Sequence, residues 1–115
     1  MFHKIEFIGR CTKDPVMRYT PDGKAVVDLN IAVDDGYGDS KKTIWFKVAA
    51  WEKMGENCNN FLHKGSLVFI EGRLHHENGN PRVWESNGKS GASYEIVATN
   101  VKFLSPKPDA TVDEF

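Results

Sequence analysis

Three side chains in one short segment could together bind a flat, negatively charged ligand. From Thr43 to Trp51 the residues alternate so that, on a strand, Trp45, Lys47 and Trp51 share one face. Indole rings stack on bases, and an ammonium group between them can attract a phosphate. A strand buried on both faces could also carry tryptophan on both sides, but Lys47 would then need a buried partner or a path to water. The segment leaves both interpretations open, and Lys47 favours a surface for single-stranded nucleic acid.

Sequence motifs for catalysis are missing. The four histidines form no H-E-x-x-H motif, there is no G-x-S-x-G, and the run Gly88-Lys89-Ser90 lacks the first glycine of a P-loop because Val83 occupies that position. Cys11 and Cys58 form no C-x-x-C pair and have no histidine at metal-ligand spacing, which indicates reduced thiols. We therefore predict that the protein is not an enzyme and has no catalytic residue, metal site or organic cofactor.

The length of the chain limits the number of domains, and its net charge limits how it can contact a negatively charged partner. A chain of 115 residues suits a single domain. The net charge is −1, but residues 105–115 carry −2, so residues 1–104 carry +1. Phosphate contacts would therefore depend on the local placement of cations. The sequence shows no secretion leader and no apolar run of about 18 residues, so we expect a cytoplasmic, nucleoid-associated protein that does not contact membranes.

Alternating side chains predict an all-β domain of five strands. In the clearest strand, Ala25 to Val33, apolar side chains at every second position oppose Asp28 and Asn30. The predicted strands cover residues 2–8, 25–33, 43–51, 66–75 and 94–104. The polar, glycine-containing residues 34–42 predict a mobile loop.

A single helix and an extended arm complete this prediction. Apolar residues at helical spacing predict a helix over residues 53–64, with Gly65 as its C-terminal cap. Turn pairs such as Asn78-Gly79 and Asn87-Gly88 predict a hairpin arm that carries Arg82 and Trp84. Three strands, a helix and two further strands are the order of a five-stranded Greek-key barrel, the OB-fold.

Several runs of residues resemble the bacterial-type single-stranded DNA-binding protein family over residues 3–104. The matching runs are Ile8-Gly9-Arg10, Asp14-Pro15, Arg18 to Lys24, Leu29 to Val33, Lys64 to Leu74, and Val101 to Leu104. The order and spacing of these runs make the resemblance specific. It implies an OB-fold, usually assembled as a homotetramer, that binds single-stranded DNA without sequence preference in replication, recombination and repair.

The resemblance also assigns roles to individual residues. Trp45 and Trp84 match the family's stacking tryptophans, and Trp51 lies where the family usually keeps an aromatic residue. Cations at or beside the family's phosphate-contacting positions are Lys4, Arg18, Lys47, Lys53, Lys64 and Arg73, and we add Arg82 on the predicted arm. Each of these charges could equally be an ordinary solvated surface charge.

The sequence departs from the family pattern at three places. His75-His76-Glu77 stands where the family tends to have a basic cluster, so we expect DNA affinity to rise on acidification. The loop of residues 34–42 is short and acidic, and its Tyr37 is a weak candidate for stacking. A short acidic tail, residues 105–115, ends Asp113-Glu114-Phe115, which we interpret as a disordered ligand for replication and repair partners. The alternative is a solubilising chain end.

Three other functions remain open at this stage. An OB-fold accessory protein of replication restart would share the barrel and use its aromatic face to bind protein. A phage-encoded single-stranded DNA-binding protein would have another set of partners. RNA could also stack on these rings, so the preference for DNA depends on the resemblance alone.

If the protein is tetrameric, we expect residues 2–8 to form the strand through which subunits pair.

Overall fold

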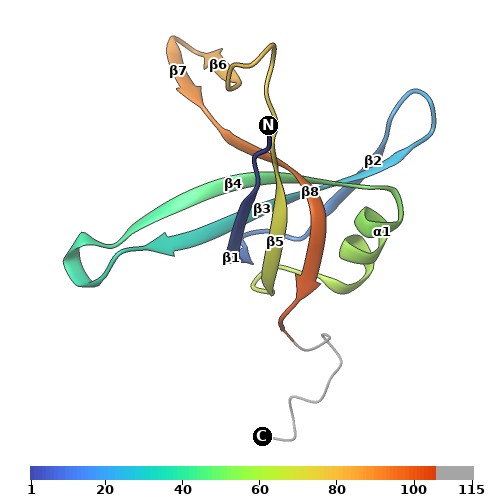
Figure 1. The fold of residues 1–115 in the computed structure, drawn as a ribbon, viewed down its shortest axis with the longest axis horizontal. Coiled ribbons are helices and arrows are strands. Elements are labelled where there is room, and N and C mark those ends of the chain that lie inside the picture. Colours follow the sequence, from blue (N-terminus) through green and yellow to red (C-terminus); the bar gives the residue numbers. More distant parts are fainter. Residues whose placement is uncertain (106–115) are drawn as a thin grey trace, which may run out of the picture.

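The computed structural model describes residues 1–105, which form a small β-barrel with a projecting ribbon and a projecting arm (Figure 1). Its elements are β1 (Ile5–Cys11), β2 (Val16–Tyr19), β3 (Ala25–Asp35), the 3-10 turn η1 (Gly38–Ser40), β4 (Lys42–Trp51), α1 (Glu52–Phe61), β5 (Leu67–Leu74), β6 (Val83–Ser86), β7 (Lys89–Ala92) and β8 (Tyr94–Phe103).

Five strands close the barrel in the order β1-β5-β8-β4-β3, and β1 returns to pair with β3. That closing contact is short, since it joins only Arg10 to Ala32 and Cys11 to Ile31. All neighbouring strands are antiparallel except β4 and β8, which run parallel. The predicted OB-fold, with its helix between the third and fourth barrel strands, is confirmed.

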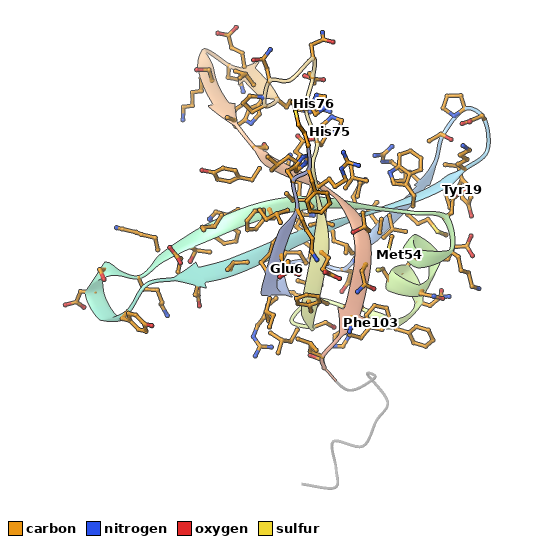
Figure 2. The ribbon with its side chains drawn as sticks, in the orientation of Figure 1. Glu6, Tyr19, Met54, His75, His76 and Phe103 are labelled. Atoms are coloured by element: carbon orange, nitrogen blue, oxygen red, sulfur yellow. The ribbon has the colours of Figure 1, made fainter. Side chains whose placement is uncertain are left out.

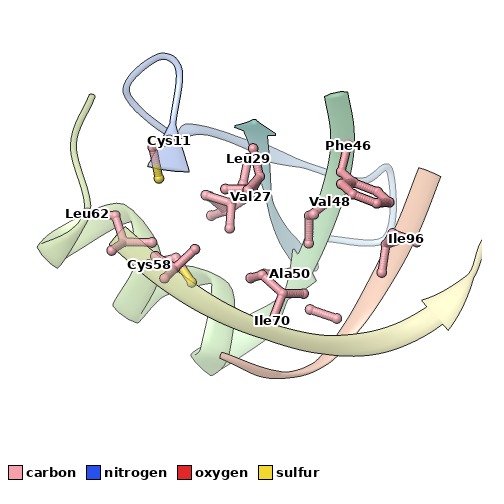
Figure 3. Close-up of a cluster of buried hydrophobic side chains, with 13 residues drawn as sticks. Cys11, Val27, Leu29, Phe46, Val48, Ala50, Cys58, Leu62, Ile70 and Ile96 are labelled. Carbon is pink, nitrogen blue, oxygen red and sulfur yellow. The ribbon is translucent and has the colours of Figure 1, made fainter. Parts of the chain in front are cut away.

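The barrel is filled by the apolar side chains that alternate along its strands (Figure 3). Leu29 and Ile31 of β3 are at most 2% exposed, and Val48 of β4 is 1% exposed. Ile70 of β5 and Ile96 of β8 complete the centre of this core. Burying these side chains supplies the main stabilisation of the barrel, and it decides which face of each strand remains for binding.

Strands β3 and β4 continue beyond the barrel as a two-stranded ribbon (Figure 1). Their pairing runs from Val26 opposite Trp51 to Asp35 opposite Lys42. The predicted loop of residues 34–42 is therefore partly wrong, because its two ends are paired strand. Cross-strand hydrogen bonds explain why β3 and β4 extend further than the predicted strands. A side-chain hydrogen bond adds to them, in which Thr43 Oγ1 donates to Asp34 Oδ1 at 3.1 Å.

Three further local predictions differ from the structure. The first strand, predicted over residues 2–8, runs over Ile5–Cys11 because its pairing with β5 and β3 begins and ends three residues later. β2 lies outside the five predicted strands, and its four residues pair with Ala25–Asp28 at the edge of β3. The helix ends at Phe61, and its last turn is closed by the Leu62 N–H donating to the Cys58 carbonyl at 2.9 Å. Gly65 is therefore not its cap. It takes a φ of +92° in the following turn, where the Ser66 N–H donates to the His63 carbonyl at 2.9 Å.

Candidate nucleic-acid interface

The face of β4 opposite the core carries the aromatic and cationic side chains that the sequence placed there. Trp45 is 62% exposed and Trp51 is 37% exposed, whereas Phe46 between them is 7% exposed. Lys47 is exposed and makes no ion pair with any residue of the described range 1–105. A strand buried on both faces is thereby excluded for β4.

Two hollows adjoin on this face and form what we call the β4 groove. The first, of about 340 Å³, is lined by Trp51 and Lys47 together with Arg18 and Arg82. The second, of about 310 Å³, is lined by Trp45 and Lys47. Both hollows include Asn30, which pairs with Lys47 across β3 and β4. The two indoles therefore stand along one groove, with the lysine between them.

The two arginines of the groove are held by carboxylates. Arg18 donates from Nε and Nη2 to the two oxygens of Asp28, at 2.8 and 3.3 Å. This pairing raises the pKa of the Arg18 guanidinium. Arg82 Nε lies 2.9 Å from Glu95 Oε2, and its Nη2 lies 3.9 Å from Glu77 Oε2. These pairs orient the guanidinium groups but also partly cancel their charge.

Trp84 lies apart from the β4 groove, on the β6–β7 arm. Its ring packs against Gly91 on the opposite strand, where a Cβ would collide with the indole. The ring is 45% exposed and lines neither hollow of the groove. The arm turns at Asn87 and Gly88, both with positive φ, as expected for an Asn-Gly hairpin. The chain therefore presents its third tryptophan on a separate support.

Four predicted cations also lie outside the groove. Lys53 is on α1 and Lys64 is in the turn before β5, where its backbone N–H donates to Asp14 Oδ1 at 2.8 Å. Arg73, near the end of β5, lines a separate hollow with three histidines. Lys4 is already engaged, because its Nζ lies 2.7 Å from Glu71 and 3.2 Å from Glu6.

Sequence reasoning missed Lys13, which lines the second hollow, and Asn30, which lines both hollows. His75, which the sequence analysis singled out for its effect on DNA affinity, lines the first hollow. Asn30 could have been found, because its position opposite the buried face of β3 follows from the period of two. The ion pairs of Asp28 with Arg18 and of Glu95 with Arg82 could not be predicted, because they depend on the pairing of β2 with β3 and on the position of the arm beside β8.

Other predicted sites fall outside this interface or outside the described residues. Tyr37, at the tip of the ribbon, is 90% exposed. Asp113, Glu114 and Phe115 lie outside the described residues. Within residues 1–105, no three histidine, cysteine, aspartate or glutamate side chains gather to hold a metal ion. The helices of the same range include none that is long and apolar enough to cross a membrane.

Comparison with known proteins matches nearly the whole chain to the family that the sequence resembles. The model of the single-strand binding protein family matches residues 2–104. "Single-stranded DNA-binding protein 2" of Listeria innocua is 35% identical over 113 residues, covering 96% of this chain and 69% of that protein. "Single-stranded DNA-binding protein" of Caldanaerobacter subterraneus subsp. tengcongensis is 39% identical over 111 residues, covering 93% of this chain and 71% of its own length.

A third relative, "Single-stranded DNA-binding protein 1" of Chlorobaculum tepidum, is 35% identical over 112 residues, covering 91% of this chain and 66% of that protein. The barrel, the exposed aromatic face of β4 and these matches agree with one another. The chain therefore belongs to the single-strand binding protein family, a family of non-catalytic proteins that bind single-stranded DNA.

Proposed function

We propose that the β4 groove binds single-stranded DNA by base stacking on Trp45 and Trp51 and by phosphate contacts from the cations between and beside them. One observation carries the proposal: two hollows that share Asn30 and Lys47 hold two exposed indoles, and Lys47 between them makes no ion pair within residues 1–105. Each stacked base contributes roughly 1–3 kcal/mol, and every base has a face that can stack. Binding would therefore be independent of sequence.

Arg18 and Arg82 would contact phosphates at the Trp51 end of the groove. Each is held in place by a carboxylate, so a phosphate approaching it must share or displace that partner. Lys53, Lys64 and Arg73 make no ion pair within residues 1–105 and would extend the phosphate path outside the groove. Lys4 is the weakest member of the set, because Glu6 and Glu71 already compensate its charge.

Trp84 would add a stacking site outside the groove. The two strands of its arm pair with each other and form a sheet separate from the barrel. The Arg82–Glu95 ion pair links the base of the arm to β8. A strand leaving the groove could then be covered by the arm, which is the role that we propose for Trp84.

The free edge of β1 supports a proposal of self-assembly into a homotetramer. Along β1, residues 5–10 pair with β5, while only Arg10 and Cys11 pair with β3 on the other side. Ile8 on this strand is 53% exposed. An open strand edge with apolar side chains favours pairing with a second copy. Sedimentation showing a monomer at micromolar concentration would contradict this assembly.

We further propose that residues 1–104 form the DNA-binding domain and that residues 105–115 form a tail for protein partners. Two carboxylates and a terminal aromatic residue, Asp113, Glu114 and Phe115, suit a basic pocket with an apolar slot. The protein would then protect single strands and recruit replication, recombination and repair proteins. Deleting Phe115 should abolish recruitment in a pull-down and leave DNA affinity unchanged, and equal recruitment by both forms would refute this role.

Tryptophan fluorescence tests the proposed DNA-binding surface directly, because the stacking residues are also the reporters. We expect strong quenching when oligo-dT is added at low salt, saturating at a fixed ratio of nucleotide to protein. Because Lys and Arg contacts release counterions, the affinity should fall as salt rises. Absence of quenching at low salt would remove the stacking role and would make protein binding by the aromatic face the leading alternative.

A further inference from the structure

Beside the β4 groove, four basic side chains line a hollow where the N-terminal segment, the end of β5 and the start of the arm meet. We call it the histidine hollow; it measures about 310 Å³ and is lined by His3, Arg73, Leu74, His75, His76 and Val97. Figure 2 shows His75 and His76 at the point where the chain leaves β5 for the arm. These lining residues include no carboxylate, so the hollow suits an anion.

Two of the three imidazole rings accept a hydrogen bond from the backbone. His3 Nε2 accepts the Leu74 backbone N–H at 3.0 Å, and His76 Nδ1 accepts the Gly79 backbone N–H at 2.9 Å. A ring nitrogen that accepts a hydrogen bond carries no proton, so protonating either nitrogen would break the bond. These two rings are therefore already engaged with the backbone through one nitrogen each.

The His75 ring is free of this constraint. It makes no hydrogen bond or ion pair with any residue in the range 1–105, although its backbone N–H donates to the Glu95 carbonyl at 2.8 Å. The side chain is only partly exposed. His75 can therefore gain a proton without losing a hydrogen bond, provided that a negative charge comes close.

The carboxylates near His75 are paired with arginines. On its groove side, Arg18 and Arg82 hold Asp28 and Glu95 at 2.8 and 2.9 Å, and Lys47 adds a further positive charge. Glu77, two positions along the chain, is exposed and lies 3.9 Å from Arg82 Nη2. On its other side lie His3, His76 and Arg73, which makes no ion pair within the described residues. In the free protein, a proton on His75 would face mostly positive neighbours.

His75 and Val97 line both the histidine hollow and the first hollow of the β4 groove, so the two spaces adjoin. We propose that the histidine hollow binds a phosphate of the DNA strand as it leaves the groove, and that His75 takes up a proton when the phosphate arrives. Arg73 supplies the permanent charge and His75 the charge that depends on pH. This inference depends on the proposed function, because the groove must hold the strand whose phosphate reaches the hollow.

The test measures the affinity for a labelled oligo-dT from pH 8 to pH 5.5 at constant ionic strength. Thymine is used because it has no group that titrates in this range. The affinity of the unmodified protein should rise on acidification, by up to about tenfold per pH unit for one proton taken up. His75→Gln should remove this rise, whereas Arg73→Gln should weaken binding at every pH and keep the rise.

Two histidine variants serve as matched controls. His63, whose Nδ1 lies 3.1 Å from Ser66 Oγ in the turn after α1, lines neither hollow, so His63→Gln should keep the full pH dependence. His76→Gln should also keep it, because the glutamine amide oxygen can accept the Gly79 N–H. Loss of the pH dependence in His76→Gln, with its retention in His75→Gln, would overturn the assignment to His75.

Calorimetry in two buffers of different ionisation enthalpy counts the protons taken up on binding. We expect a net proton uptake of at most one for the unmodified protein and none for His75→Gln. DNA binding with no proton uptake would overturn the histidine hollow and leave the groove intact. If the unmodified protein fails to bind oligo-dT at any pH at low salt, the proposed function itself is overturned, and this inference falls with it.

Discussion

Arg18 of β2 and Asp28 of β3 lie diagonally across the two strands, since Arg18 pairs with Val26 and Asp28 pairs with Val16. The Arg18 guanidinium donates to both carboxylate oxygens of Asp28, at 2.8 and 3.3 Å. Both residues line the first hollow of the β4 groove. A cation of the proposed DNA path is therefore already compensated by a carboxylate of the same protein. The pair holds the guanidinium in a fixed orientation, and a phosphate must compete with Asp28 for it.

Replacing Asp28 with asparagine should therefore strengthen DNA binding. The substitution removes the competing charge and leaves Arg18 free to pair with a phosphate. We expect a higher affinity for oligo-dT and a salt dependence steeper by about one phosphate contact, measured by tryptophan quenching between low and high salt. Asp39→Asn, in the ribbon tip outside both hollows, is the control and should change neither quantity by as much. An affinity that falls in Asp28→Asn would show that orienting Arg18 matters more than freeing it.

The two groove tryptophans should each contribute separately to affinity. Trp45→Ala and Trp51→Ala should each weaken oligo-dT binding by roughly 1–3 kcal/mol, which corresponds to about 5- to 150-fold. Phenylalanine at either position keeps a ring that can stack, so Trp45→Phe should lose less. Fluorescence anisotropy of a labelled oligonucleotide measures these losses without depending on the removed fluorophore. Equal affinities for Trp45→Ala and the unmodified protein would remove that end of the groove from the binding surface.

The stability of the barrel should fall in acid partly because of Glu71. Hydrogen bonds from Lys4 Nζ and from Asn100 Nδ2 lower the pKa of Glu71 from its ordinary value of 4.5 to about 2. Because this pKa is lower in the folded chain than in the unfolded chain, the ionised carboxylate stabilises the fold above about pH 4.5. That stabilisation is lost as the pH falls toward 2.

Urea unfolding at a series of pH values measures this contribution. Glu71→Gln should unfold more easily than the unmodified protein near neutral pH, and the difference should shrink as the pH falls from 4.5 toward 2. Glu85→Gln, on the arm and exposed, is the matched control and should follow the unmodified protein. A difference between Glu71→Gln and the unmodified protein that is independent of pH would contradict the ion pair as its cause.

The two thiols should react slowly in the folded protein. Cys11 and Cys58 are free and buried in the core (Figure 3). Burial, with a smaller contribution from neighbouring negative charge, raises the pKa of Cys11 to about 11 and that of Cys58 to about 12. At pH 8 the reactive thiolate is then scarcer than at an ordinary cysteine by about a hundredfold or more. Colour development with a disulfide reagent should be slow in buffer and fast in urea, and rapid labelling of both thiols in the folded state would contradict their burial.

The alternation of residues 43–51 was sufficient to predict which side chains of β4 face outward, because the period of two is a local property of a strand. Other local patterns predicted the remaining elements: alternation gave the five barrel strands, helical spacing gave the helix between β4 and β5, and the Asn-Gly pairs gave the arm that carries Trp84. Family resemblance then connected these elements with DNA. Local patterns and the resemblance together determined the fold class and the identity of the family.

Only the tertiary structure decided which charges are free and which side chains share a hollow. β2 is a strand because of the β3 edge beside it, and that edge also brings Asp28 to Arg18. Lys4 meets Glu71 across 67 positions of sequence, and Trp84 lies on its own arm, apart from the β4 groove. Such contacts depend on strand register and barrel closure, which bring distant residues together, and no local period in the sequence encodes them.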